Sequence, residues 1–463
     1  MSDSMRKDDG KEHKTGVKSS KIKDLFPLSF IIAFVFDLIY GFFYYRQFNA
    51  ISLYDTASYF TAADNILKGH PDLLRTPVYP LFLHICNKIT SEHVNELSVG
   101  IQIAVFYISI FIFFRLISLF TSNHVIRAAG TIFYGCMSPV AGFNFLMLTE
   151  SFSVSGMVLF AYLLVLFLRE WKIRHYTCCI ILSLILTLLR PSSVFLFVVV
   201  FIAGIIWLVR IISTKQKAKR NIIPPVCFAL CLAVLFGYME MNRLYNGFFG
   251  LSYVSEMNKF YDVVQADIWQ GAADPDICYT IQSKLDEGES PLAAAIDTAS
   301  LYMDSPIERE QIISFSKEAI SSNRSQYAYY LAKKVFTMGY SNMEYNLSND
   351  SYFLKDDANK KLLWPGDLMD FNINFVYFVV LLSFIGITAA AIKKKFLKSE
   401  LIITLIIAGQ SAVNILAGPA EFHRLNVPCY PFALLIVMIW AGLAFDRIIS
   451  SKSGSEKEEA PQK

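Results

Sequence analysis

Long apolar runs with few or no charges recur along this chain and constrain its fold more than any other feature. A helix of about 20 apolar residues crosses a hydrocarbon core of about 30 Å. Charged residues make up only 17% of the chain, whereas soluble domains carry about a quarter. We therefore expect an all-α polytopic membrane protein with about ten transmembrane helices, at roughly 25–45, 98–120, 128–144, 151–168, 176–190, 193–212, 222–241, 371–392, 399–417 and 426–446.

Three basic clusters predict the orientation. They are "REWKIRH" (169–175), "STKQKAKRN" (213–221) and "KKKFLK" (393–398), and a ten-span topology places all three on one side. Positively charged loops stay in the cytoplasm. The polar segment 1–24 lacks the apolar core and cleavage pattern of a signal peptide, so we expect it and segment 447–463 to be cytoplasmic tails. The expected location is a bacterial plasma membrane, with the protein crossing it several times.

The opposite, outer side receives two long polar segments. Segment 46–97 interrupts a membrane module at 25–241. Its apolar run 77–90 is too short to span, so it predicts a juxtamembrane helix that is either interfacial or re-entrant. Segment 242–370 is large enough for an extracytoplasmic domain, and a three-span module follows at 371–446.

Ionisable residues gather at the outer ends of several spans, in positions that also have simpler explanations. A single arginine can be an interfacial anchor, Glu150 can interact with a helix dipole, and Asp55 can cap the following helix. Their joint placement on one face favours a site instead. The group comprises Asp55, Arg75, Glu150, Arg190, Glu421, His423 and Arg424.

Arg190 is the most informative member of this group. The apolar run 176–189 gives about 21 Å of helix, which places Arg190 near or slightly within the outer membrane boundary. Pro191 disfavours helical geometry at the residue before it, so the backbone is expected to break there. Ionisable groups at such depth usually face a cavity or a partner.

Carboxylates beside cationic donors at this level suit a lipid phosphate. Arginine binds phosphate through two parallel hydrogen bonds, and a carboxylate can remove a proton from an attacking hydroxyl. The chain has no phosphate-binding glycine loop, nucleophile elbow or H-E-x-x-H motif. The residues alone therefore indicate group transfer from a membrane-anchored phosphate donor.

The stretch "LYDTASYFTAADNILKGHPDLLRTPVYPLFL" resembles the first outer loop of the GT-C superfamily of integral membrane glycosyltransferases. It is most similar to the branch of the protein O-mannosyltransferases and the lipid A aminoarabinose transferase. "LTES", "LLRPSS" and "EFHRLNVPCYP" resemble later landmarks of that family. Two features depart from the branch: Thr56 follows Asp55 where the O-mannosyltransferases carry Asp-Glu, and Val78 stands where glycine is usual.

The resemblance implies a GT-C-like fold and sugar transfer, with inversion, from a polyprenyl-phosphate donor to an extracytoplasmic glycan, lipid or protein acceptor. Asp55 would be the general base. Glu150, which resembles the family's second outer acid, is the second catalytic candidate and could position the acceptor or substitute as base. Arg75, Arg190, Arg424 and His423 would bind the donor phosphate. Three residues would line the cavity: Tyr59, Tyr79 and Glu421. No metal or cofactor is expected.

Two other functions remain open from the sequence. A surface-polysaccharide polymerase or ligase with a lipid-diphosphate donor would also need arginines on the outer face. A non-enzymatic transporter or flippase of lipid-linked sugars would favour charges at the membrane midplane and internal repeats, whereas most charges here lie at the interface.

Overall fold

The computed structural model describes residues 27–50, 54–214, 222–337, 354–363, 373–392, 398–418 and 422–458. These residues are mostly helical, with one isolated bridge between Phe48 and Leu354. The expected tail at 1–24 and the site residue Glu421 lie outside them, as does the side chain of His423. The all-α polytopic architecture expected from the sequence is confirmed.

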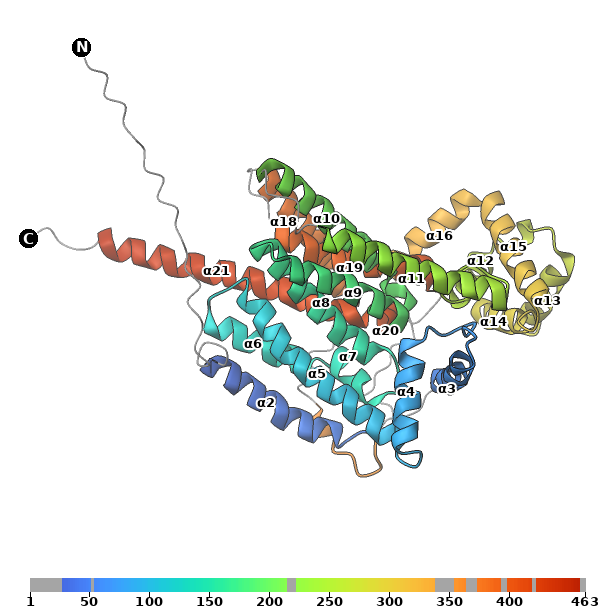
Figure 1. The fold of residues 1–463 in the computed structure, drawn as a ribbon, viewed down its shortest axis with the longest axis horizontal. Coiled ribbons are helices and arrows are strands. Elements are labelled where there is room, and N and C mark those ends of the chain that lie inside the picture. The colour runs from blue at the N-terminus through green and yellow to red at the C-terminus, as the bar shows by residue number, and fades with distance from the viewer. Residues whose placement is uncertain are drawn as a thin grey trace, which may run out of the picture.

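Among the described residues, eight helical segments are long and apolar enough to cross a membrane (Figure 1). The helices that provide them are α2 (Leu28–Tyr45), α5 (Val94–Ser118), α8 (Glu150–Glu170), α10 (Phe195–Thr214), α11 (Ile223–Asn246), α18 (Ile373–Ile392), α19 (Lys398–Ala417) and α21 (Tyr430–Glu458). The last helix continues beyond residue 446, so part of the expected tail 447–463 extends α21.

Two of the ten expected spans take a shorter form. Segment 128–144 divides into α6 (His124–Cys136), α7 (Ser138–Ala141) and the 3-10 turn η1 (Gly142–Phe145). The break lies at Met137, whose backbone is extended directly before the Ser138-Pro139 start of α7. Pro139 cannot continue the preceding helix, because it has no N–H to donate and its ring clashes with the carbonyl four residues back. Segment 176–190 forms α9 (Ile173–Leu189), of 17 residues.

Short helices lie beside one end of the bundle. Helix α3 (Tyr54–Leu67) follows α2, and α4 (Val78–Ile89) occupies the run expected to form a juxtamembrane helix. One face of α4 buries Tyr79 and Leu83, whereas Ile85 and Ile89 are exposed. Its 12 residues are too few to cross a bilayer. We call this end of the bundle, where α2 ends and α8 begins, the site end.

Five further helices form an appended unit at the site end, at the right of Figure 1. They are α12 (Val254–Gln265), α13 (Pro275–Asp286), α14 (Pro291–Ser300), α15 (Pro306–Ser322) and α16 (Arg324–Thr337), with the turn η4 (Trp269–Gly271). The unit has its own hydrophobic core, which includes Phe260, Trp269 and Phe315. It therefore packs as a compact body around its own apolar residues.

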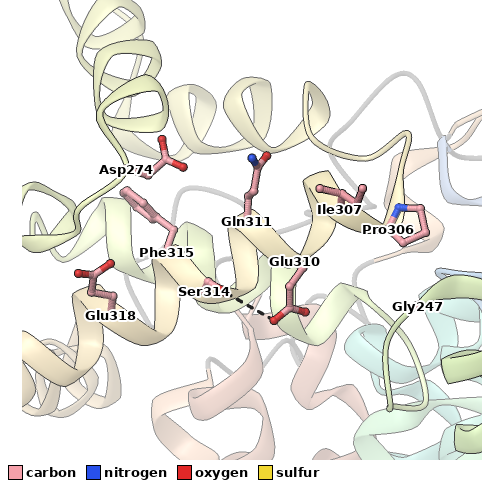
Figure 2. A pocket seen from close by; sticks show the side chains of 9 residues that line it. All are labelled: Gly247, Asp274, Pro306, Ile307, Glu310, Gln311, Ser314, Phe315 and Glu318. Carbon is pink, nitrogen blue, oxygen red and sulfur yellow. Dashed lines mark hydrogen bonds between the residues drawn. The ribbon is translucent and has the colours of Figure 1, made fainter.

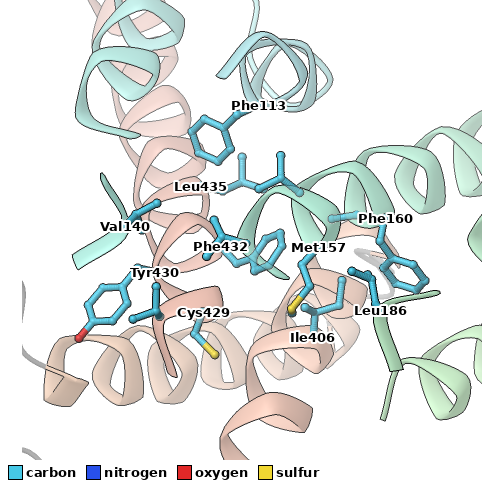
Figure 3. Close-up of a cluster of buried hydrophobic side chains, with 14 of the residues drawn as sticks. Phe113, Val140, Met157, Phe160, Leu186, Ile406, Cys429, Tyr430, Phe432 and Leu435 are labelled. Carbon is cyan, nitrogen blue, oxygen red and sulfur yellow. The ribbon is translucent and has the colours of Figure 1, made fainter. Parts of the chain in front are cut away.

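The membrane bundle has a separate, larger core (Figure 3). Phe113 of α5, Met157 and Phe160 of α8 and Phe432 and Leu435 of α21 meet there. Helix α21 thus packs among helices from the first half of the chain. This packing brings α20 (Phe422–Asn426) and the turn η7 (Val427–Cys429), which precede α21, close to the start of α8. Two smaller 3-10 turns are η2 (Pro191–Val194) and η6 (Lys360–Leu362).

Candidate functional site

Five of the ionisable residues singled out from the sequence meet at the site end. Asp55 lies in the first turn of α3, and Glu150 is the first residue of α8. Arg75 lies in the connection between α3 and α4, Arg190 ends α9, and Arg424 lies on α20. Four separate helices and one connection therefore supply a single cluster of two carboxylates and three guanidinium groups.

Each oxygen of the Asp55 carboxylate is bound by a different arginine. Arg75 Nη2 donates to Oδ1 at 2.6 Å, and Arg424 Nη2 donates to Oδ2 at 2.7 Å. Arg75 Nε also donates to Ser58 Oγ, one turn along α3 from Asp55, at 2.7 Å. The carboxylate thus serves as a bridge between two arginines, which its role as a helix cap would not explain.

Glu150 forms the second half of the cluster and is 1% exposed. Its Oε1 accepts a hydrogen bond from Arg424 Nε at 2.7 Å and lies 3.6 Å from Arg190 Nη2. Thr149 Oγ1 donates to Oε2 at 3.4 Å. Arg424 therefore links both acids, because Nε faces Glu150 while Nη2 faces Asp55.

Arg190 differs from the other two arginines. Its backbone is extended, at φ −148° and ψ 114°, so the break expected before Pro191 is confirmed. The residue is 7% exposed, yet its Nη1 atom has no hydrogen-bond partner among the described residues. A buried guanidinium donor without a partner is costly. This atom marks where an additional acceptor would be favourable.

The electrostatic state of Asp55 follows from its neighbours. Burial by itself would raise the pKa of this carboxyl, but the guanidinium groups of Arg75 and Arg424 outweigh it and lower the pKa from 3.8 to about 2. Asp55 is consequently ionised at neutral pH. The described ionic groups of the cluster then carry two negative and three positive charges, a net charge of +1.

Local sequence explains how Arg75 is presented. Asp72 Oδ1 accepts the backbone N–H groups of Leu74 and Arg75, each at 2.9 Å, which forms a tight turn before Pro77. The guanidinium carbon of Arg75 lies 4.6 Å from the ring centroid of Tyr59 on α3. The ring supports the cation from one side, and Asp55 fixes it from another.

Tyr59 and Tyr79, which the sequence places at the cavity, are almost completely buried in this structure. They are 4% and 0% exposed, and their rings pack edge to face with centroids 4.9 Å apart. Tyr79 Oη donates to Gln102 Oε1 at 2.7 Å. The tyrosines form a buried layer beneath Arg75, because α4 folds against α5 and encloses them.

Sequence reasoning missed the polar residues that support this layer. Gln102 of α5 donates to the backbone oxygens of Asn144 and Leu146, at 3.0 and 2.8 Å. Asn144 in turn accepts from Ser151 Oγ at 2.5 Å. The available signal was an amide within the apolar run 98–120, since buried amides require partners.

No metal site is evident in the parts of the chain that the structure describes: no group of three or more His, Cys, Asp and Glu side chains is placed to hold an ion. A groove of about 540 Å³ lies elsewhere, along α15 of the appended unit (Figure 2). Its lining includes three acids, Asp274, Glu310 and Glu318. The arginine cluster and this groove are therefore distinct features.

The chain was compared with protein families, curated proteins and solved structures. No protein-family model and no curated protein matches the sequence. Among solved structures, the fold is similar to an archaeal oligosaccharyltransferase, AglB from Archaeoglobus fulgidus, determined with an inhibitory peptide and a dolichol-phosphate. The TM-score is 0.45 and the sequence identity 11%, over 94% of this chain. The chain spans about half, 52%, of the length of that protein.

Proposed function

We propose that this protein is a membrane glycosyltransferase that uses a polyprenyl-phosphate-linked sugar as donor. The sugar passes, with inversion, to a hydroxyl of an acceptor at the site formed by Asp55, Glu150 and the three arginines. The protein needs no resident cofactor for this reaction, because the lipid phosphate is itself the leaving group.

The unpartnered Nη1 atom of buried Arg190 is the observation that carries the proposal. It lies in a cluster whose described ionic groups carry a net charge of +1, beside an acid that is already bound to Arg424. A phosphodiester carries one negative charge, so it neutralises the cluster and supplies acceptors for the free N–H groups. A lipid diphosphate would leave an excess negative charge, which disfavours the polymerase or ligase alternative.

The reaction is a single displacement at the sugar. The acceptor oxygen forms a bond to the anomeric carbon while the bond from that carbon to the phosphate oxygen breaks. The acceptor proton passes to the Asp55 carboxylate as general base, and the lipid leaves as a phosphate monoester. The second negative charge that develops on this phosphate is stabilised by the arginines.

Base activation depends on the donor in this mechanism. A carboxylate with a pKa of about 2 is a weak base, because Arg75 and Arg424 hold its charge. When the donor phosphate takes hydrogen bonds from one of these arginines, Asp55 loses a partner and its basicity rises. Glu150 keeps Arg424 and Arg190 near the phosphate.

We also propose that the site end faces away from the cytoplasm, with both termini inside, in a bacterial plasma membrane. The basic connections at 169–175, 213–221 and 393–398 support this orientation. Cysteine labelling with a membrane-impermeant reagent should modify Ser283→Cys in intact cells and spare Ser213→Cys. The reverse pattern would overturn the orientation.

The function is tested by two measurements. Purified protein in detergent should bind a short-chain prenyl phosphate. It should bind a prenyl-phosphate sugar, a phosphodiester, more tightly than the corresponding prenyl-diphosphate sugar. Mass analysis of surface glycans and glycolipids, with and without the protein, should show one sugar lost from a single class of acceptor. Unchanged glycans together with no binding of prenyl phosphate would reject the proposal.

A further inference from the structure

The two arginines that bind Asp55 come from parts of the chain that are far apart in the sequence. Contacts elsewhere in the fold must therefore fix the distance between them. Arg75 lies in a connection between two short helices, and Arg424 lies on α20, a helix of five residues. Short helices and connections have little stability of their own. Both segments are held by contacts with the appended unit, directly for the Arg75 turn and through α19 for α20.

The first segment is held through its backbone oxygens. Leu73 O accepts from the backbone N–H of Tyr253 at 2.9 Å, and Leu74 O accepts from Ser252 Oγ at 2.6 Å. Leu73 and Leu74 also pack against an apolar cluster that contains Tyr253 and Ile313. The residues leading into α12, together with α15, thus fix the turn that presents Arg75.

The second segment is held at the end of α19. The last carbonyl groups of a helix have no partner within it. Lys334 Nζ of α16 donates to Ile415 O at 3.0 Å, and Asn258 Nδ2 of α12 donates to Ala417 O. Two helices of the appended unit therefore cap α19 from outside the membrane bundle.

Lys334 is built into this contact by a buried ion pair. Its Nζ lies 2.8 Å from both carboxylate oxygens of Asp262, and the two side chains are 4% and 0% exposed. Burial raises the pKa of Asp262 to about 6 and lowers that of Lys334, although each partner opposes this shift. Such pairs add little stability compared with apolar residues, but they fix geometry.

Helix α19 in turn contacts the backbone beside Arg424. Asn414 Nδ2 donates to Leu425 O at 2.9 Å, and Gln410 Nε2 donates to the same oxygen at 3.3 Å. Leu425 directly follows Arg424 on α20. The last turns of α19, capped by the appended unit, thus hold the backbone next to the arginine that bridges both acids.

We infer that the appended unit is a clamp that sets the distance between the two arginines around Asp55, with Lys334 and Asp262 as positioning residues. The unit contacts the Arg75 turn on one side and the end of α19 on the other. This inference rests on the proposed function for its effect on donor binding. The clamp itself depends only on the contacts described.

The principal test replaces the ion pair as a unit. The double variant Asp262→Leu/Lys334→Met leaves no unpaired buried charge, so it is expected to fold. Its affinity for a fluorescent short-chain prenyl phosphate should fall about tenfold, because α19 loses one cap and Arg424 shifts. Lys284→Met is the matched control, because Lys284 also pairs with carboxylates in the same unit, at Glu289 and Asp297. This variant should bind the prenyl phosphate with wild-type affinity.

A double-mutant cycle separates positioning from general damage. In an Arg424→Gln background the ion-pair replacement should cause no further loss, because the arginine it positions is gone. In an Arg190→Gln background the loss of about tenfold should persist. Equal losses in both backgrounds, or no loss in either, would overturn the clamp. If the double variant fails to fold, Asn258→Ala, which removes the hydrogen bond to Ala417 O, replaces it in the same double-mutant cycle.

A measurement without ligand separates this inference from the proposed function. Amide hydrogen exchange of the peptide covering α20 should accelerate in the ion-pair variant and stay unchanged in Lys284→Met. Failure of wild-type protein to bind prenyl phosphate would count against the proposed function, and the exchange data would still judge the clamp. Unchanged exchange at α20 would overturn the clamp.

Discussion

Arg424 Nη2 lies 2.7 Å from Asp55 Oδ2, although the two residues are 369 positions apart in the sequence. The same guanidinium group binds Glu150 through its Nε atom. The two acids are therefore held by one arginine, and a change in its position alters both of them. This shared contact determines which variants can separate the roles of the acids.

We expect Asp55→Asn to lower the rate of sugar transfer by about 10²- to 10⁴-fold, because the amide keeps the shape of the carboxylate but removes its basicity. Glu150→Gln should have a smaller effect on rate, because Glu150 orients Arg424 and Arg190. The measurement is transfer from a synthetic polyprenyl-phosphate sugar by the purified proteins. Near-normal turnover in Asp55→Asn, with collapse in Glu150→Gln, would assign the base to Glu150.

Arg190→Gln should weaken prenyl phosphate binding by about ten- to a hundredfold, which corresponds to the loss of one charge-assisted hydrogen bond. Its melting temperature should fall less than that of Arg424→Gln, because the variant loses only the 3.6 Å contact with Glu150, which retains Arg424. Arg424→Gln should lower both affinity and melting temperature, since it removes bonds to two acids. Titration and thermal unfolding of both variants distinguish these outcomes.

The pH dependence of kcat/KM should report the arginines around Asp55. The pKa of Asp55 in the enzyme without donor is about 2. The wild-type profile of kcat/KM should therefore show no fall caused by protonation of Asp55 above about pH 4. Arg75→Gln removes one opposing charge while burial remains, so the pKa rises and an acid limb moves to higher pH. A pH profile for Arg75→Gln that superimposes on wild type would show that Arg75 does not set this pKa.

The lowered pKa of Asp55 also makes the stability of the folded protein depend on pH. The folded pKa of Asp55 lies below its ordinary value of 3.8, so its ion pairs stabilise the protein fully above that value. This contribution is lost as the pH falls through about 2. The Asp55→Asn variant should therefore show a smaller loss of thermal stability on acidification than wild type.

Tyr79→Phe tests the buried layer beneath Arg75. The change leaves Gln102 Oε1 without its 2.7 Å partner, which should cost about 1–3 kcal/mol of unfolding free energy. Tyr329→Phe, at a tyrosine that is 71% exposed, is the control and should be neutral. Equal melting temperatures for the two variants would show that this hydrogen bond contributes little.

The sequence predicted those parts of the fold and site that depend on local patterns. Apolar run length predicted most of the long apolar helices, and Pro191 predicted the backbone break at Arg190. The position of charges on the outer side predicted the five described residues that meet, whereas Glu421 and the side chain of His423 lie outside the described residues. These features succeed because hydrophobic thickness and proline geometry act over a few residues.

Features that depend on tertiary packing were beyond the sequence. Periodicity indicates that Tyr79 has an apolar face, but it cannot show that α4 folds onto α5 and buries the ring. Likewise, Lys334 and Asp262 are ordinary residues of amphipathic helices in the sequence, and only their packing against α19 gives them a common role.

The distance in sequence between Asp55 and Arg424 also determines when the site can form. Asp55, Arg75, Glu150 and Arg190 are all synthesised before the appended unit, whereas Arg424 follows it. Most of the bundle can insert while the two acids still lack their shared cation. Arg424 can bind the two acids only after α19 and α20 have been synthesised. A chain that ends before α20 lacks Arg424, so under the proposed function it would lack the cation that binds both acids.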